Sequence, residues 1–346
     1  MNAAAKNYDG VNKYIRITDI DEVSSTYTDK DIVSPDGVLT DNYLVNNRDI
    51  LLARTGASTG KSYLYKKSDG KLYYAGFLIR ANVTTHDPYF VFSQLHTHRY
   101  WRWVSIMSAR SGQPGINSQE YSSFPIYTTS IEEESKIAKL LSLLDERIAT
   151  QNKIIEDLKK LKSAISKKLL CNDKWTTYKI QDIAEIGRGR VISSVEIDRQ
   201  KNPLYPVYSS QTSNNGIMGY LDNYMFDGEY ITWTTDGANA GTVFYRKGKF
   251  NCTNVCGTLK IQPKFDCYFV SLVLQQATQK YVSSNLANPK LMNNTMASIK
   301  IRMPNIETQK QLSKVFQTLD SCLLVHQRTY KMYLSEKQYL LCQMFI

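Results

Sequence analysis

The segments IYTTSIEEESKIAKLLSLLDERI at 126–148 and IRMPNIETQKQLSKVFQTLDSCL at 301–323 are two versions of one pattern. With an offset of 175 residues, the chain from each segment's start aligns without a gap for 45 residues. The aligned polar residues include the identical pairs Asp145/Asp320 and Lys162/Lys337. A repeat of this length indicates two copies of one structural unit.

The repeat continues upstream of these segments at slightly different offsets. RTGASTG at 54–60 matches TDGANAG at 235–241, and HDPYFVF at 86–92 matches FDCYFVS from Phe265. Small changes of offset are typical of insertions in loops. Each copy is therefore predicted to be a globular block followed by a long helical tail.

Both tails carry the signals of a helix start. Ser130 lies three residues before Glu133, which is the spacing of a capping box, and Asn305 after Pro304 is the matching N-cap. The apolar residues that follow are spaced alternately by four and three, a heptad seam of about 33 residues with two polar interruptions at equivalent places.

Two helices of matching length and seam can cover each other's apolar stripe. Two similar units in one chain are usually related by a pseudo-two-fold, which favours antiparallel helices. The alternative is that each helix packs on its own globular block. The seam residues predicted to meet are Leu141, Leu144, Ile148, Ile155, Leu158, Phe316, Leu319, Leu323, Tyr330 and Tyr333.

The composition favours a polyanionic partner. The 346 residues contain 43 Lys+Arg against 32 Asp+Glu, a formal net charge of +11. No uncharged apolar run approaches the ~18 residues of a membrane span, and MNAAAKNYDG at 1–10 lacks the apolar core of a secretory signal. The six cysteines are too sparse for a disulfide framework. We expect a cytoplasmic protein with reduced thiols and no membrane contact.

The globular blocks mix strand and helix signals, so the predicted fold class is α+β (mixed α/β). It consists of two repeated globular domains separated by two long antiparallel coiled-coil helices. Helices are expected to begin near Pro88 and Tyr268. Strands are expected at 14–18, 49–53, 73–80, 205–208, 229–234 and 258–262. The expected boundaries are 1–129, 130–170, 171–304 and 305–346.

No motif supports a catalytic or metal site. GASTGKS at 56–62 resembles a P-loop but has three residues instead of four between the glycine and Gly-Lys, so a glycine turn is expected. DPYF at 87–90 resembles an amino-methyltransferase element but lacks its second proline, so a helix start is expected. His96-Thr97-His98 and Cys252/Cys256 do not recur between the copies and lack partner pairs. We predict a non-catalytic chain without a metal site.

Recognition of nucleic acid remains, because basic residues attract phosphates and Asn, Gln, Arg and Ser on glycine-rich loops suit base edges. The alternative for each residue is a solvated loop position. Tyr100 to Trp103 could stack on bases or belong to the core. The candidate DNA-binding residues are Arg54, Lys61, Arg110, Gln113, Asn117, Arg188, Arg190, Gln211, Asn214, Asn215, Asn239, Lys290, Asn293 and Asn294.

This layout resembles the specificity subunit of type I restriction-modification systems. The resemblance is carried by the helix starts Ile131-Glu132 and Ile306-Glu307 with the heptads that follow them. FPI at 124–126 and WTTYKIQDIAEI at 175–186, which resembles the opening strand of a target recognition domain, extend it. The family implies that 1–129 and 171–304 are target recognition domains and that the two tails are spacer helices.

The resemblance further implies that each recognition domain reads one half of a split, asymmetric site in double-stranded DNA. The helices would set the gap between the halves. The subunit would join two methyltransferase subunits and two restriction/translocase subunits. S-adenosylmethionine, ATP and Mg²⁺ would be bound by those partners and no cofactor by this chain.

One departure from the repeat affects the first half. The second copy opens with 175–190, and nothing before Tyr14 matches it, so the first recognition domain is expected to lack an opening segment. Two other functions stay open at this point. A coiled-coil scaffold could bind protein or RNA with its terminal domains, and a self-contained methyltransferase is disfavoured by the missing cofactor loop.

Overall fold

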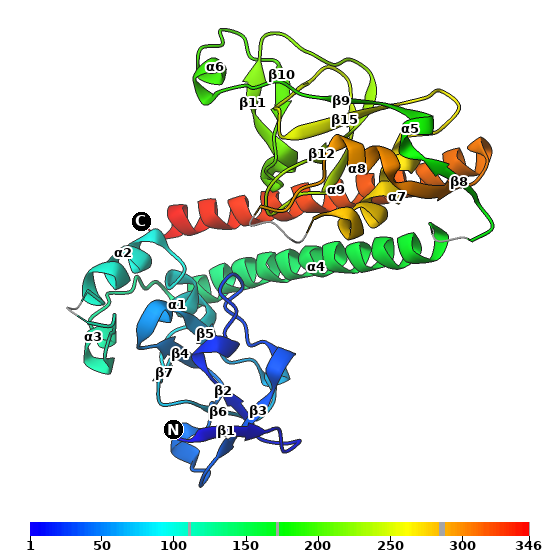
Figure 1. Cartoon of the computed structure of the whole chain (residues 1–346). Coiled ribbons are helices and arrows are strands. Elements are labelled where there is room, and N and C mark those ends of the chain that lie inside the picture. The colour runs from blue at the N-terminus through cyan, green and yellow to red at the C-terminus, as the bar shows by residue number, and fades with distance from the viewer. Residues whose placement is uncertain (110–111, 171–172, 284–287, 346) are drawn as a thin grey trace. The chain divides into compact units, whose positions relative to one another are not determined.

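The computed structural model describes residues 1–109, 112–170, 173–283 and 288–345 (Figure 1). The chain divides into unit 1 (Met1–Ile155 with Val325–Ile346) and unit 2 (Glu156–Leu324). The division falls within two helices of 39 residues each, α4 (Ile131–Leu169) and α9 (Ile306–Met344). No helix in the described part of the chain is long and apolar enough to cross a membrane.

The two long helices begin where the sequence predicts. The Oγ of Ser130 accepts a hydrogen bond from the backbone N–H of Glu133 at 3.3 Å, and Oδ1 of Asn305 accepts one from Thr308 at 2.9 Å. Each cap satisfies one of the N–H groups that a helix leaves unpaired in its first turn. Three glutamates in the first turn of α4 suit the positive end of its dipole.

The described residues of unit 1 form three small sheets and three short α-helices before α4. The largest sheet is antiparallel, in the order β5-β4-β7, and β2 pairs with β6 in parallel. The strands are β1 (Ala4–Asn7), β2 (Lys13–Ile15), β3 (Val33–Asp36), β4 (Asp49–Ala53), β5 (Ser62–Leu64), β6 (Leu72–Tyr74) and β7 (Leu78–Asn82). The helices are α1 (Pro88–Gln94), α2 (His98–Met107) and α3 (Ser118–Ser122).

Strand β4 is central to unit 1 because all five of its residues are buried. Its alternate side chains point to opposite faces. Ile50 and Leu52 join the apolar cluster of the three helices, while Leu51 and Ala53 join a second cluster with Ile15 and other residues. The single strand predicted at 73–80 is two strands, β6 and β7, interrupted at 75–77.

Unit 2 repeats this plan with additions. Its main antiparallel sheet has the order β13-β12-β15-β9, and a second sheet has the order β11-β10-β14 with β10 and β14 parallel. The strands are β8 (Thr176–Lys179), β9 (Ala184–Arg188), β10 (Tyr205–Tyr208), β11 (Ile217–Leu221), β12 (Glu229–Thr234), β13 (Val243–Lys247), β14 (Asn251–Cys252), β15 (Cys256–Ile261) and β16 (Lys300–Met303). The helices are α5 (Ile180–Ile183), α6 (Ser194–Asp198), α7 (Cys267–Ala277) and α8 (Asn293–Ser298).

The repeat maps β4, β5 and β7 onto β12, β13 and β15. The segment WTTYKIQDIAEI, expected to be one opening strand, forms β8, the turn of helix α5 and the start of β9. Strand β9 pairs with the outer edge of β15. In the described residues of unit 1, the equivalent strand β7 is the edge of its sheet.

The core of unit 2 lies between its main sheet and α7. Ile231 and Trp233 of β12 and Leu259 of β15 belong to one apolar cluster with α7 and with Phe316 of α9. A β-carbon at Gly257 would lie 2.1 Å from the indole ring of Trp233, so this strand position requires glycine. The 11-residue helix α7 is thereby fixed between the sheet and the beginning of α9.

Segments of α4 and α9 pack antiparallel in each unit. In unit 1, Ala138, Leu141, Leu341 and Phe345 form one buried cluster with Phe90 of α1. In unit 2, Ile165 of α4 packs against the cluster that contains Phe316 of α9 and Leu170, the residue directly after α4; Leu312 and Leu319 of α9 also pack against it. The alternative in which each helix packs only on its own globular block is therefore wrong. Of the predicted seam residues, Leu141, Leu144, Ile155 and Phe316 are buried, and Ile148, Leu158, Leu319, Leu323, Tyr330 and Tyr333 are half-buried.

We expect Leu141→Ala to lower the free energy of unfolding by about 2–5 kcal/mol, because it removes buried methyl groups and leaves a cavity. Leu141 is 0% exposed in the cluster that joins α4 and α9 in unit 1. Its neighbour Leu140 is 48% exposed, so Leu140→Ala is the matched control and should change stability by less than about 0.5 kcal/mol. Urea unfolding of both variants measures the difference, and equal losses would contradict this packing.

We expect stability to fall in acid through His96. Burial, assisted by the nearby charge of Lys337, lowers the pKa of this imidazole to about 4 from 6.5. Because the unfolded chain binds the proton at a higher pH than the folded chain, the contribution of His96 is full above pH 6.5 and is lost as the pH falls towards 4. The loss should reach roughly 3 kcal/mol. His96→Gln should flatten the unfolding free energy between these pH values, and His98→Gln, on an exposed residue, should not.

Candidate nucleic-acid interface

Loop pair 1 brings together two segments of unit 1 that are far apart in the sequence, 54–60 and 112–115. The N–H of Gly56 donates to the carbonyl of Pro114 at 2.9 Å, and the N–H of Ile116 donates to the carbonyl of Arg54 at 2.9 Å. Arg54 and Gln113 are both exposed on this pair. Gly56 has a φ of +74°, and a β-carbon there would lie 3.0 Å from Nε2 of Gln113. A glycine is thus needed where the two loops meet.

Loop pair 2 of unit 2 consists of 235–241 and 288–290 and has the same backbone connections. The N–H of Gly237 donates to the carbonyl of Pro289 at 3.0 Å, and the N–H of Leu291 donates to the carbonyl of Thr235 at 2.9 Å. Asn239 is exposed on the longer loop. Each unit therefore has the same backbone arrangement at this place, with different side chains on it.

A shared carboxylate organises the cations of loop pair 2. Nη2 of Arg188, at the end of β9, lies 3.3 Å from Oδ2 of Asp236, and Nζ of Lys290 lies 3.6 Å from Oδ1. The hydroxyl of Thr235 donates to Oδ2 at 2.6 Å. Two cations and one anion leave a net positive cluster whose side chains are held in place, which suits hydrogen bonding to an anionic or base-edge acceptor.

A third segment, 209–217, lies beside a buried arginine. Asn214 and Asn215 are exposed and have φ values of 48° and 54°, and Nε2 of Gln211 donates to the carbonyl of Ile217. The guanidinium carbon of Arg246 lies 3.5 Å from the ring centre of Tyr208, and Nε donates to Thr232 at 3.2 Å. Burial lowers the pKa of Arg246. A β-carbon at Gly216 of this segment would lie 3.2 Å from Nη2 of Arg246, so this cation lies directly beside the segment.

The other predicted DNA-binding residues are less free for contact. Asn117 caps α3, Arg190 forms a two-pronged ion pair with Glu196, and Lys61 lies 3.9 Å from Glu22. Asn293 donates to the carbonyl of Gly187 at 3.4 Å. Asn294 is exposed on α8, and Arg110 lies outside the described residues.

The motifs interpreted as structural have the roles expected of them. The 56–62 segment forms the turn between β4 and β5 and the first residue of β5, and Asp87 and its repeat mate Asp266 cap α1 and α7. Cys252 and Cys256 are buried, and burial raises the pKa of both thiols. On α2, Tyr100 is fully buried in the core and Trp101 is exposed.

Sequence reasoning missed Asp236 and Arg246. Asp236 replaces Thr55 of the first copy, so a change of charge between matched loops was the signal available for it. Arg246 has no such signal, because its burial depends on the packing of β10 and β13 in three dimensions. In each unit the structure brings together only part of the predicted set, on loop pair 1 in unit 1 and on loop pair 2 in unit 2.

The family model of the type I restriction modification DNA specificity domain matches this chain twice, at residues 1–160 and 172–331. The chain belongs to this family. Each match spans a globular block and much of the long helix that follows it. The sequence-based identification as a specificity subunit of a type I restriction-modification system is thereby confirmed.

Three relatives come from Mycoplasma pneumoniae (strain ATCC 29342 / M129). One putative type I specificity subunit is 38% identical over 195 residues, which cover 55% of this chain and 81% of that protein. The N-terminal part of another is 46% identical over 148 residues, covering 41% and 76%. The type I restriction enzyme MpnII specificity subunit is 42% identical over 146 residues, covering 42% and 43%.

Solved structures agree with the fold of a specificity subunit. The S subunit of a type I restriction-modification system from M. genitalium matches with a TM-score of 0.73 and 17% identity, covering 98% of this chain and 89% of that chain. A chain from a study of complex assembly and conformational transition of the type I system matches with a TM-score of 0.55 and 13% identity, covering 96% and 90%.

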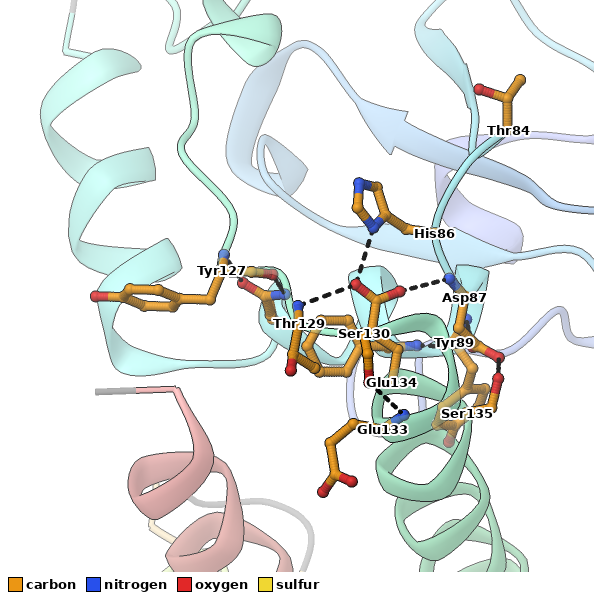
Figure 2. A network of polar contacts seen from close by, with 12 residues as sticks. Thr84, His86, Asp87, Tyr89, Tyr127, Thr129, Ser130, Glu133, Glu134 and Ser135 are labelled. Carbon is orange, nitrogen blue, oxygen red and sulfur yellow. Dashed lines mark hydrogen bonds and ion pairs between the residues drawn. The ribbon is translucent and has the colours of Figure 1, made fainter.

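A buried carboxylate anchors the globular part of the first specificity domain on α4. Glu134, fully buried in the first turn of the helix, accepts hydrogen bonds from the backbone N–H of Asp87 at 2.9 Å and of Thr129 at 3.3 Å. Its Oε1 lies 2.8 Å from Nδ1 of His86 (Figure 2). Burial alone would raise the pKa of Glu134, but these hydrogen bonds outweigh it and hold the pKa below its usual value.

The second specificity domain has Gln309 at the equivalent place. Its Oε1 accepts from the backbone N–H of Asp266 at 3.0 Å, and its Nε2 donates to the carbonyl of Pro304 at 2.8 Å. In both domains the side chain thus accepts from the backbone N–H of a helix-capping residue, Asp87 of α1 in the first domain and Asp266 of α7 in the second. The shared requirement is an acceptor at this position, and the charge is particular to Glu134.

We therefore expect Glu134→Gln to be tolerated and Glu134→Ala to lower the free energy of unfolding by about 2–3 kcal/mol. Glutamine keeps an acceptor for the N–H of Asp87, as Gln309 does for Asp266, whereas alanine leaves buried N–H groups unpaired. Thermal unfolding of the two variants measures the difference. Equal stability of both variants would show that the anchor does not depend on the acceptor.

Proposed function

We propose that this specificity subunit reads a two-part, asymmetric site in double-stranded DNA, with one specificity domain on each half. The observation that carries this proposal is the recurrence of the loop pair in both units with different side chains. Arg54 and Gln113 occupy loop pair 1, whereas Asp236, Asn239 and Lys290 occupy loop pair 2. Different hydrogen-bonding groups on one scaffold favour different base pairs, and the net charge of +11 favours the phosphates.

Four further predicted residues of unit 2, Arg188, Gln211, Asn214 and Asn215, are proposed to help in phosphate or base contact. Arg188, through its link to Asp236, belongs to the same group as Lys290, and Gln211, Asn214 and Asn215 form a further contact segment in unit 2. Contacts to phosphates would fix the position of each domain, and contacts to bases would select the sequence.

We propose that two methyltransferase subunits and two restriction/translocase subunits complete the enzyme. S-adenosylmethionine, ATP and Mg²⁺ would then serve those partners, and this chain would contribute recognition and no chemistry. A complex that modifies chromosomal DNA works where the chromosome lies, so we propose a cytoplasmic location. The scaffold alternative gains no support from the comparisons. It predicts binding to duplex DNA no stronger than binding to RNA or protein.

The half-site assignment is tested with the subunit assembled with its methyltransferase partner. Arg54→Ala should change the bases selected at one half-site and lower methylation of the native site by about 10–100-fold, because a base contact contributes about 1–3 kcal/mol. Asn239→Ala should act in the same way on the other half-site only. Both residues are exposed, so folding should be unaffected. The readout is sequencing of methylated positions in a random DNA library.

Each variant is the control for the other. The proposal fails if the wild-type complex selects one continuous palindrome or no motif. The assignment of loop pairs to halves fails if either variant alters both halves equally.

A further inference from the structure

Polar residues interrupt the apolar seam of each long helix, and each of these residues contacts a polar residue of the other helix. Lys337 and Lys162 occupy equivalent seam positions of α9 and α4, as do His326 and Gln151. Oε1 of Gln151 lies 2.7 Å from Nδ1 of His326 in unit 1. A polar group inside a seam costs stability, and its best-attested use is to fix the register and partner of a coiled coil.

In unit 1 three elements meet at one carboxylate. Nζ of Lys337 on α9 lies 2.6 Å from Oδ1 of Asp145 on α4. The hydroxyl of Tyr89 on α1 donates to Oδ2 of the same residue at 2.5 Å. Burial, with the adjacent charge of Asp145, raises the pKa of Tyr89, which keeps its hydroxyl protonated as a donor. One aspartate therefore joins the globular domain to both helices.

Unit 2 contains the same arrangement with the roles of the helices exchanged. Lys162 on α4 forms a hydrogen-bonded ion pair with Oδ1 of Asp320 on α9, and the hydroxyl of Tyr268 on α7 donates to Oδ2 at 2.6 Å. Burial and Asp320 raise the pKa of Tyr268. The lysine side chains are only 21% exposed in unit 1 and 25% exposed in unit 2. Recurrence in both units argues against a chance surface contact, which usually contributes little.

We propose that Asp145–Lys337–Tyr89 and Asp320–Lys162–Tyr268 are register clamps: positioning residues that fix α4 against α9 and thereby the number of base pairs between the two half-sites. This inference rests on the proposed two-part reading of DNA and adds which residues determine the gap. None of the six residues belongs to a loop pair, so the clamps do not choose the bases.

The clamps work by making other registers unfavourable. Apolar seam residues tolerate a slip of one heptad, because it again brings apolar residues opposite each other. Such a slip would place Asp145 opposite Tyr330 or Met344 instead of Lys337, leaving both charges without their partner. A heptad is about 10 Å of helix, which corresponds to about three base pairs of DNA.

The test uses the subunit with its methyltransferase partner and a DNA library in which the two wild-type half-sites are separated by varied gaps. Lys337→Met and Lys162→Met each remove a clamp cation but keep an unbranched side chain. We expect methylation at gaps other than the native one to rise at least 10-fold relative to the native gap, with the bases of both half-sites unchanged. Lys160→Met is the matched control on α4, because Lys160 is exposed and its partner Asp157 lies on the same helix.

The exchange Asp145→Lys with Lys337→Asp restores an ion pair in the native register and should return the native gap preference. If Lys337→Met does not assemble, this double variant decides alone: a native gap supports the clamp, and a relaxed gap or no complex overturns it. Lower thermal stability with unchanged gap preference would show that the residues are merely structural. A wild-type complex without a two-part motif would instead refute the proposed function, which is a separate outcome.

Discussion

The apolar stripe of each long helix must be covered by the stripe of the other, and the rest of the molecule depends on this constraint. A helix with a heptad seam cannot leave that seam in water, and in each unit a segment of α4 is covered by a segment of α9. The globular parts attach to the helices through short helices α1 and α7, whose N-caps Asp87 and Asp266 are in turn bonded by side chains of the long helices. Helix pairing and domain attachment are thus one connected system.

Within each globular part, the residues that pack the core are separate from the loop residues that differ between the two units. The central strands β4 and β12 place apolar side chains against helices, and the loops that follow them are tied by backbone hydrogen bonds to a second loop. Because these ties use the backbone, side chains such as Arg54 or Asp236 can differ without loss of the arrangement. A stable frame with exchangeable loop residues is suited to reading different sequences.

Much of this organisation could be predicted from the sequence, because helices of 39 residues have a clear period and the repeat doubles each signal. Strands 49–53, 205–208 and 229–234 were predicted at their observed bounds. Short strands such as β5 and β14 have too few residues for a period, and the break at Ala75 was not visible. Candidate contact residues were predicted from residue type alone. Residue type does not reveal that Asn117 caps a helix or that Glu196 forms an ion pair with Arg190.

The spacing of the charges within each helix has a consequence for self-association. Asp145 and Lys162 of α4 are 17 residues apart, as are Asp320 and Lys337 of α9. If two copies of α4 packed antiparallel in the register of the native α4–α9 pair, each aspartate would therefore lie opposite the lysine of the other copy. One repeat alone already contains a self-complementary edge, whereas the Gln151–His326 contact of unit 1 requires both helices. The pairing of α4 with α9 of the same chain is then favoured because the two helices are covalently connected, which keeps the effective concentration of the correct partner helix high.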